Sequence, residues 1–454
     1  MVRFPPTSPR KTRNDEEICF LRVFESSWWH LSGDSNLLRL NMKFIRTLLI
    51  GSAAAIMGSA LLTAQRGPTD WTQWRGANRD GAVAAFTAPA TWPQQLNQKW
   101  KVEVGAGYAS PLVIGNRLYL FSRQGADEVM SAMDPETGKV IWRTAYPVAV
   151  TMHPAATKHG EGPKSTPIFA GGKLFSIGMT GVVTAFDAST GKQLWQKPGS
   201  TPLPMYNSHS FSPLVDGGAV IFHVGGHMQG ALKAFDVNTG AEKWSWNGDG
   251  PGYGSPIAVD IAGTHQIVTI TQGKIVSVNP ASGTLLWERP YVSANFTNAV
   301  TPVLYGQTLI VSGNGGPTVA FTVKKDGNQW TTENAWENAD VPYRLSNSVL
   351  VRDALFGLSS RNMGQYFAVD AKTGKTLWTS EPRQAGNAAI LRAGDLVFSL
   401  QDNGDLLIFR SGGTSFEQLK KYTVAQSETW TQPTISGNRI FVKDVSNLTL
   451  FTLN

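Results

Sequence analysis

Histidine is the residue in this sequence whose distribution most suggests chemistry. Five of the seven histidines fall within one stretch of the chain, at His153, His159, His209, His223 and His227. Neutral imidazole is a common ligand for transition metals, and three imidazoles in suitable geometry hold one ion. His153, His209, His223 and His227 are therefore a candidate metal site. His223 and His227 lie in a Gly-rich stretch and lack the helical geometry that would direct both rings to one ion. The alternative is therefore that these are loop histidines that only form hydrogen bonds.

Other motifs that carry catalytic chemistry do not occur in the sequence. Cys19 is the single cysteine, so there is no haem-attachment motif and no adjacent cysteine pair. Neither a G-x-S-x-G nucleophile elbow nor an H-E-x-x-H zinc motif is present. The formal net charge is +7, but no basic run with interleaved aromatic residues occurs, so we do not expect nucleic-acid binding.

A repeated phrase of eleven residues, A-x-D-x-x-T-G-x-x-x-W, defines the elements that position these residues. Four full copies end at Trp142, Trp195, Trp244 and Trp378, and a looser copy containing Asn279 ends at Trp287. Asp, Thr and Gly favour a tight turn, and the flanking alternation predicts a strand on each side. A second, Gly-centred hairpin precedes each copy. Four strands per unit of roughly 40–50 residues are typical of a propeller blade.

The hairpins predict an all-β, eight-bladed β-propeller. Their first residues are Pro111, Pro167, Pro213, Pro256, Pro302, Val349, Ile390 and Pro433. The eighth unit lacks a closing tryptophan, which residues 96–104 supply with Trp100, so we expect this N-terminal strand to close the ring. The fifth unit is expected to end in a shorter phrase at Trp330. The tryptophans expected to pack against the next blade are Trp100, Trp142, Trp195, Trp244, Trp287, Trp330 and Trp378.

The tryptophan phrase resembles the pyrroloquinoline-quinone (PQQ)-type repeat, over about residues 70–454. That family includes quinoprotein alcohol dehydrogenases and a quinone-free outer-membrane protein assembly lipoprotein. The dehydrogenases imply PQQ beside calcium, a catalytic Asp and often adjacent cysteines. No Asp in this sequence matches the catalytic one, and no cysteine pair exists. No catalytic residue is therefore assigned and no cofactor is demonstrable. PQQ with calcium stays the alternative. The opening W-x-x-W-R-G-x-N-R-x-G, residues 71–81, is similar to segments that precede such propellers and implies a clasp, residues 65–95, before the propeller of residues 96–454.

The N-terminal residues have the features of a targeting segment. Residues 1–41 are interpreted as an over-extended, disordered start. Residues 42–64 combine a basic start, an uncharged apolar run and small residues, which indicates a secretory signal peptide; an uncleaved anchor is the alternative. The lipoprotein of the resembling family would need Cys where Gln65 stands. We therefore expect a periplasmic or secreted monomer whose mature form has no membrane span.

Propeller topology predicts that tight turns share one face and long, varied links share the other, where function tends to lie. Three residues before each inner hairpin the chain should enter the central channel from the long-loop face, at Tyr108, Lys164, Ser210, Tyr253, Ala299, Ser346, Asn387 and Trp430. Arg361 is a further candidate. An aromatic and cationic funnel suits an anionic, planar or sugar-like ligand; ordinary channel lining with bound water is the alternative.

Three functions are consistent with this sequence. The leading hypothesis is a non-enzymatic binding or scaffold protein of the cell envelope, whose partner is an envelope protein or a small molecule at the long-loop face. Such a partner would dock on the loops or add a strand to a blade edge, and an apolar patch beside the channel would accompany docking. The alternatives are a small PQQ-dependent dehydrogenase and a propeller that binds a sugar or another small molecule.

Overall fold

The computed structural model describes residue 67 and residues 69–199 and 208–453. These residues belong to a compact unit that begins at Gln65. Residues 1–41 and the expected signal peptide, residues 42–64, lie outside the described part. The described helices are short, and none has the length and hydrophobicity that a membrane span needs.

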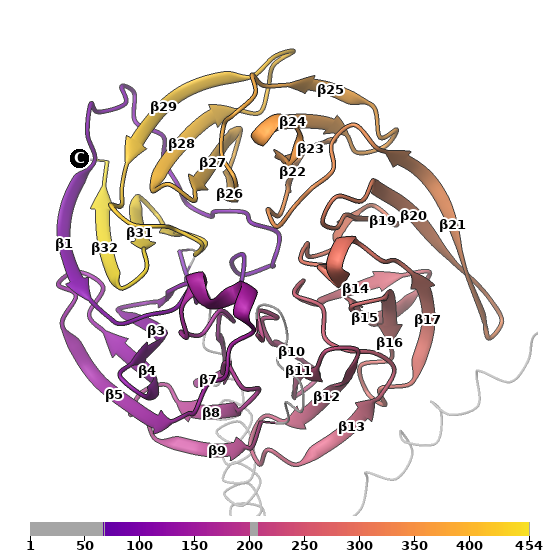
Figure 1. Ribbon diagram of the computed structural model, residues 1–454, viewed down its shortest axis with the longest axis horizontal. Coiled ribbons are helices and arrows are strands. Elements are labelled where there is room, and N and C mark those ends of the chain that lie inside the picture. Colours follow the sequence, from indigo (N-terminus) through magenta and orange to yellow (C-terminus); the bar gives the residue numbers. More distant parts are fainter. Residues whose placement is uncertain (1–66, 68, 200–207, 454) are drawn as a thin grey trace, which may run out of the picture. The chain divides into compact units, whose positions relative to one another are not determined.

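Eight four-stranded antiparallel sheets are arranged in a ring, which confirms the predicted eight-bladed propeller (Figure 1). Each blade places one short strand next to the central channel and one strand at the rim.
The innermost strands are β2 (Leu112–Ile114), β6 (Ile168–Ala170), β10 (Leu214–Asp216), β14 (Ile257–Ile261), β18 (Val303–Tyr305), β22 (Val349–Val351), β26 (Ala388–Ala393) and β30 (Thr434–Ser436).
The second strands are β3 (Arg117–Gln124), β7 (Lys173–Ile177), β11 (Ala219–Gly226), β15 (Thr264–Ile270), β19 (Thr308–Val311), β23 (Ala354–Ser359), β27 (Leu396–Gln401) and β31 (Arg439–Lys443).
The third strands are β4 (Asp127–Met133), β8 (Val183–Asp187), β12 (Gln229–Asp236), β16 (Lys274–Val278), β20 (Thr318–Asp326), β24 (Gln365–Asp370), β28 (Asp405–Arg410) and β32 (Asn447–Thr452).
The rim strands are β5 (Val140–Pro147), β9 (Gln193–Lys197), β13 (Glu242–Trp246), β17 (Leu285–Pro290), β21 (Gln329–Asn338), β25 (Thr376–Thr379), β29 (Glu417–Thr423) and β1 (Asn97–Glu103).
Three 3-10 turns lie in the connections: η1 (Pro154–His159), η2 (Ala294–Phe296) and η3 (Arg361–Met363).

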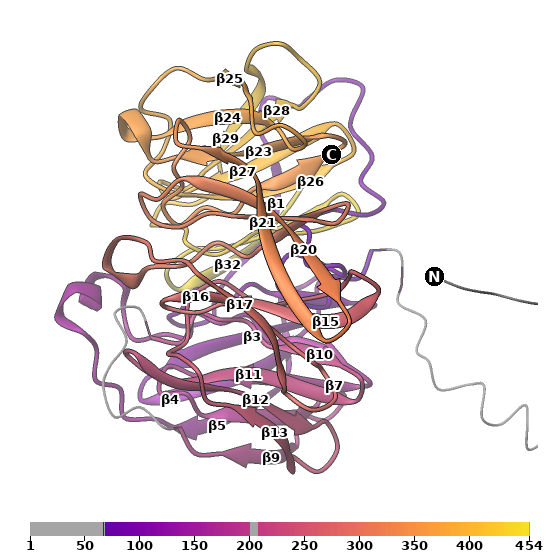
Figure 2. The ribbon, with the colours of Figure 1, turned by 90° about the vertical axis from the view of Figure 1, so that its right-hand side faces the viewer.

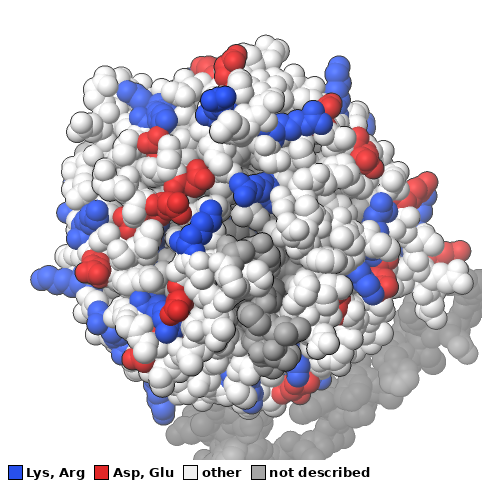
Figure 3. Space-filling model, in the orientation of Figure 1, with Lys and Arg blue, Asp and Glu red and all other residues white. Residues whose placement is uncertain are grey.

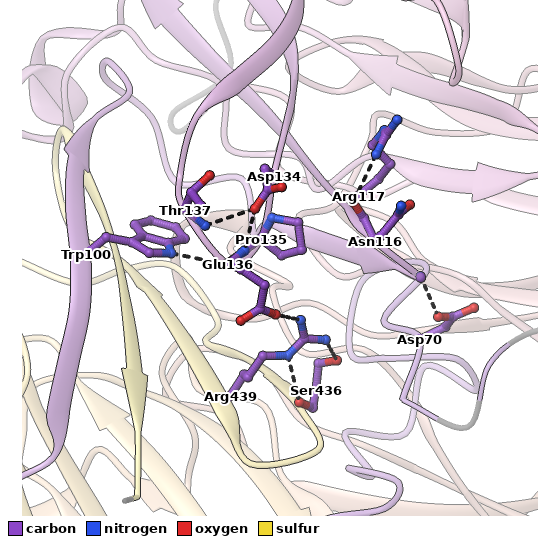
Figure 4. Close-up of polar contacts among 11 residues, drawn as sticks. Asp70, Trp100, Asn116, Arg117, Asp134, Pro135, Glu136, Thr137, Ser436 and Arg439 are labelled. Carbon is purple, nitrogen blue, oxygen red and sulfur yellow. Dashed lines mark hydrogen bonds and ion pairs between the residues drawn. The ribbon is translucent and has the colours of Figure 1, made fainter.

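Strand β1 completes the eighth blade, as the sequence predicts. It pairs antiparallel with β32, and Trp100 lies opposite Leu450. The Trp100 indole N–H donates to the Pro135 carbonyl oxygen of blade one at 3.1 Å. In Figure 4, Arg439 of blade eight also forms an ion pair with Glu136 in the same blade-one turn. Strands β1 and β32, from the two ends of the propeller sequence, are therefore joined in one sheet, and this blade eight also contacts blade one.

The tryptophan that ends each phrase contacts the turn of the next blade. The Trp142 indole N–H donates to the Ala188 carbonyl oxygen at 3.1 Å, and its ring lies over Gly191. A Cβ built on Gly191 would lie 2.5 Å from that ring, and the residue has a φ of +76°, so only glycine fits. Trp195 and Trp244 donate to Val237 and Pro280 in the same way.

The expectation for Trp330 is wrong, because the β20–β21 hairpin is longer than the sequence pattern indicated. Ala320 lies opposite Trp336, the register in which Ala132 lies opposite Trp142. The Trp336 indole N–H donates to the Ala371 carbonyl oxygen at 3.0 Å. Trp330 instead lies near the hairpin tip, with the Lys325 ammonium 5.1 Å from its ring centre.

Trp287 and Trp378 precede blades whose turns lack the D-x-x-T-G residues, and their indoles make other contacts. The Trp287 indole N–H donates to Gln266 Oε1 of its own blade at 2.7 Å, while its ring packs edge-on against Phe321. Trp378 packs against Phe409 and Phe416 of blade seven.

The two faces of the ring differ as predicted. Figure 2 shows η1 and η3 on one face and the segment that precedes β1 on the opposite face. On that opposite face, the Asp70 carboxylate accepts from the Gly115 N–H at 2.9 Å (Figure 4), and Asn438 Oδ1 accepts from the Thr87 N–H at 3.0 Å. Asp80 forms an ion pair with Arg392 at 3.1 Å. The segment thus contacts the tight turns of blades one and eight and the inner strand of blade seven.

Candidate functional site

Two arginines of the N-terminal segment fill the channel from the tight-turn face. Arg75 and Arg79 are 2% and 5% exposed. The Arg75 guanidinium donates to the Ser348 carbonyl oxygen of blade six at 2.6 Å. The Arg79 guanidinium donates to the carbonyl oxygens of Ser212 and Pro213 of blade three, at 2.9 and 2.8 Å. Because these acceptors immediately precede inner strands, the two cations span the channel.

A cavity of about 170 Å³ lies above this plug and faces the long-loop side of the ring. We call it the channel cup. Its lining consists of Trp74, Tyr108, His159, Lys164, Ser210, Tyr253, Ala299, Leu345, Asn347, Asn387 and Trp430. Trp74 precedes the plug arginine in sequence and donates its indole N–H to Thr301 Oγ1 at 3.4 Å.

Most residues that the sequence places at the channel mouth line this one cup. Tyr108, Lys164, Ser210, Tyr253, Ala299, Asn387 and Trp430 all do so. Ser346 points away from the lining and donates its hydroxyl to Asn387 Oδ1 at 2.8 Å, while its neighbours Leu345 and Asn347 face the cup. Arg361 lies outside the lining, is exposed in η3 and donates to the Ala339 carbonyl oxygen at 2.8 Å.

Sequence reasoning missed His159 and Trp74 as parts of the cup. His159 ends η1, which Figure 1 shows near the centre of the ring. Its ring packs edge-on against Trp430, with ring centres 4.7 Å apart, and lies 6.5 Å from Tyr108. The signal that could have found it is the long link between blades one and two, since a link of that length can reach over the channel.

The lining of the cup carries basic groups, while Glu428 and Asp444 outside the lining act on its Tyr108. Burial lowers the pKa of Lys164 to about 8, and its Nζ atom has no hydrogen-bond partner among the described residues. Burial, Lys164 and Lys158 lower the pKa of His159. None of the lining residues is Asp or Glu. Glu428 is exposed beside the cup, where it accepts from the Trp430 indole N–H at 2.9 Å. Figure 3 shows Lys and Arg side chains beside the central hollow of this face, with Asp and Glu side chains next to them.

The histidines proposed as metal ligands form separate contacts. His209 is buried with Nδ1 3.3 Å from the Met179 carbonyl oxygen, and His223 is buried with Nε2 3.1 Å from the Asp249 carbonyl oxygen. Burial lowers the pKa of both, to about 4 for His223. His227 is exposed against Phe296, and His153 lies just before η1. Within the described ranges, no three His, Cys, Asp or Glu residues have the arrangement of a metal site.

The cup does not fit PQQ with calcium. Calcium takes six to eight oxygen ligands, including carboxylates, and the lining offers none of the latter. PQQ is a fused tricyclic tricarboxylate. A lining with one lysine and no carboxylate therefore lacks both the calcium ligands and the positive charge for this cofactor.

Comparisons with known proteins agree with the fold. The family model described as outer membrane protein assembly factor BamB matches residues 125–380, more than half of the chain. The chain is 24% identical over 342 residues to BamB of Burkholderia pseudomallei (strain K96243), covering 66% of this chain and 86% of that protein. It is 26% identical over 291 residues to polyvinylalcohol dehydrogenase of Sphingopyxis sp. (strain 113P3), covering 63% of this chain but 35% of that enzyme. The crystal structure of BamB from Moraxella catarrhalis superposes with a TM-score of 0.58 at 18% identity, over 79% of this chain and 99% of that chain.

Proposed function

Because this chain belongs to the PQQ-repeat propeller family whose model is that of outer membrane protein assembly factor BamB, we propose that it is an exported, non-enzymatic binding protein of the cell envelope. Its role would be in the assembly of outer-membrane proteins, through a protein partner that docks on the long-loop face. The similarity to BamB of Burkholderia pseudomallei, which extends over most of that protein, supports this role.

The structural observation that carries the proposal is a set of exposed apolar side chains on the long-loop face. Four large apolar residues outside the strands are at least one-third exposed: Met228, Val292, Met363 and Val445. Each lies in a link that opens on the long-loop face, in or beside blades three, four, six and eight. The other exposed large apolar side chains of the described part stand in the first two positions of rim strands, at Val140, Ile141, Leu194, Leu285 and Leu377. Exposed apolar residues in loops on one face are a feature of interaction surfaces.

Backbone strain supports the same surface. Met228 and Met363 have φ angles of 58° and 63°, although they are 48% and 67% exposed. A non-glycine residue in the left-handed region costs about 1–2 kcal/mol. Hydrogen bonds hold both turns, since the Met228 N–H donates to Gln272 Oε1 at 2.6 Å and the Gly364 N–H to the Arg361 carbonyl oxygen at 2.9 Å. The two side chains are therefore presented to solvent by turns of fixed conformation. Methionine also adapts its shape to a partner surface.

The test is a rescue experiment with two sets of variants. In cells that lack this protein, we expect folded outer-membrane proteins to decrease, as measured by heat-modifiable gel mobility. The wild-type chain should restore them, and the double variant Met228→Asp, Met363→Asp should not. Leu194→Asp, which changes an exposed rim residue of β9, is the matched control and should restore them fully.

Two outcomes would contradict the proposal. Unchanged levels of folded outer-membrane proteins in cells lacking the chain would exclude the assembly role. If instead Leu194→Asp failed and the methionine variant succeeded, the partner would bind by adding a strand to a blade edge rather than by docking on the loops.

A dehydrogenase function is the weaker candidate. The similarity to polyvinylalcohol dehydrogenase covers 35% of that enzyme, so the enzyme's remaining parts have no counterpart in the alignment. The lining of the cup also lacks the carboxylates that a calcium–quinone site needs.

A further inference from the structure

We propose that the channel cup is a binding site for a small carboxylate on a body of about one ring, with the Lys164 ammonium as its charge partner. This inference is independent of the assembly role, because it concerns the channel and not the apolar long-loop surface.

The buried cations at the channel form no ion pair within the described residues. Arg75, Arg79 and Lys164 are the cations that face the channel. The two guanidiniums donate to backbone carbonyls and to Gln73. Asp80, the acidic group that acts on Arg75, pairs with Arg392. Buried charges in proteins are normally paired, because an unpaired one costs several kcal/mol.

The plug arginines bind backbone next to residues of the cup. Arg79 donates to the Ser212 carbonyl oxygen, two residues after Ser210 of the cup. Arg75 donates to the Ser348 carbonyl oxygen, one residue after Asn347 of the cup. The plug therefore ends directly beneath the cavity. Lys164 lines the cup whereas the two guanidiniums lie outside its lining, so Lys164 is the cation that an anion in the cup would meet.

The Lys164 ammonium is buried without a hydrogen-bond partner among the described residues. Burial alone lowers its pKa to about 8. An ammonium has three donors, and a carboxylate would accept from them with a charge-assisted bond. The Nζ atom itself is sealed from solvent, so a carboxylate in the cup would meet it after a turn of the flexible lysine side chain toward the cup.

The lining of the cup is largely aromatic. Tyr108, Tyr253 and Trp430 form aromatic walls, and Trp74 forms the floor. Asn387 adds an amide. The volume of about 170 Å³ is close to that of an engineered cavity, roughly 150 Å³, that binds benzene. Apolar walls with a few polar groups are typical of small-molecule sites. A single planar ring that carries one negative charge fits this lining.

Benzoate is the probe that tests this, with binding measured by calorimetry on the full chain. We expect benzoate to bind and its neutral isostere benzamide to bind at least tenfold more weakly, since a hydrogen bond to a charged group contributes about 1.5–3 kcal/mol. Acetate has the charge without the ring and should also bind more weakly. No detectable benzoate binding at millimolar concentration, or equal binding of benzamide, would overturn the proposal.

Variants locate the site. Lys164→Gln should weaken benzoate binding at least tenfold. Lys192→Gln removes the same charge from an exposed turn on the opposite face and should leave binding unchanged. Asn387→Asp keeps the oxygen that accepts from Ser346 and adds a carboxylate to the cup, so it should also weaken binding, even if Lys164→Gln fails to fold. Equal binding by wild type and Asn387→Asp would exclude the cup. Tighter binding of PQQ with calcium than of benzoate would contradict the argument from charge and calcium ligands.

Discussion

At the scale of single residues, Trp336 and Trp330 make a matched pair for testing the docking contact. Trp336 is 9% exposed and bonds to the next blade, so Trp336→Ala should lower the free energy of unfolding by about 3–5 kcal/mol. Trp330→Ala removes the same side chain from a hairpin tip, where its cation–π contact with Lys325 contributes about 0.5–1 kcal/mol. Urea unfolding followed by circular dichroism measures both. Equal costs for the two variants would show that the indole contact between blades is not what stabilises the ring.

This pair also shows what the sequence could predict for single residues. Where the phrase kept its eleven-residue spacing, as at Trp142, Trp195 and Trp244, the contact with the next blade could be predicted from the turn chemistry. In blade five the hairpin is extended, so the spacing no longer identifies the tryptophan opposite Ala320. Register depends on where the turn lies, and a turn built on Asp326 and Gly327 has no counterpart in the repeated phrase.

At the scale of elements, strand β1 allows a test of ring closure. The double variant Lys101→Pro, Val102→Pro removes two consecutive N–H groups from the strand opposite Thr449 and Leu448. At least one of them faces β32, and an unpaired acceptor there costs about 1–3 kcal/mol. Opening the ring would also expose the interface between blades eight and one. We therefore expect a lower melting temperature and faster proteolysis near the N-terminus of the propeller.

The matched control for closure is the equivalent strand of blade seven. Lys420→Pro, Lys421→Pro in β29 removes the same kind of hydrogen bonds opposite Ile408 and Leu407. Because β29 follows β28 directly in the chain, the loss of this pairing does not open the ring. A smaller loss of stability in β29 than in β1 would show that closure contributes beyond local pairing. If the two losses are equal, the β1–β32 sheet has no special role in holding the ring together.

The elements also explain how much of the cup could be predicted. The channel-facing residues Tyr108, Lys164, Tyr253 and Trp430 follow from the offset before each inner strand, because the propeller repeats that geometry in every blade. His159 and Trp74 come from an inter-blade link and from the segment before the propeller. Neither the link nor the segment is part of the repeat, so the repeat spacing could not predict these two residues.

At the scale of the whole molecule, four blades share the same turn aspartate, which predicts an acid-sensitive ring. Hydrogen bonds from the turn backbone and hydroxyl groups lower the pKa of Asp134, Asp187, Asp236 and Asp370, to about 2 for Asp187. A carboxylate whose pKa is lower in the folded chain adds stability above its unfolded pKa, near 3.8, and that stability is lost as the pH falls towards 2. Blade four supplies the neutral version, since Asn279 accepts the equivalent N–H of Ser282 and also that of Ala281. Replacing all four aspartates by Asn should therefore reduce the melting temperature at pH 7 and leave it close to wild type near pH 2. If the difference in melting temperature between the two proteins stayed constant from pH 7 to pH 2, these carboxylates would not control acid unfolding. The buried groups between blades would then control it.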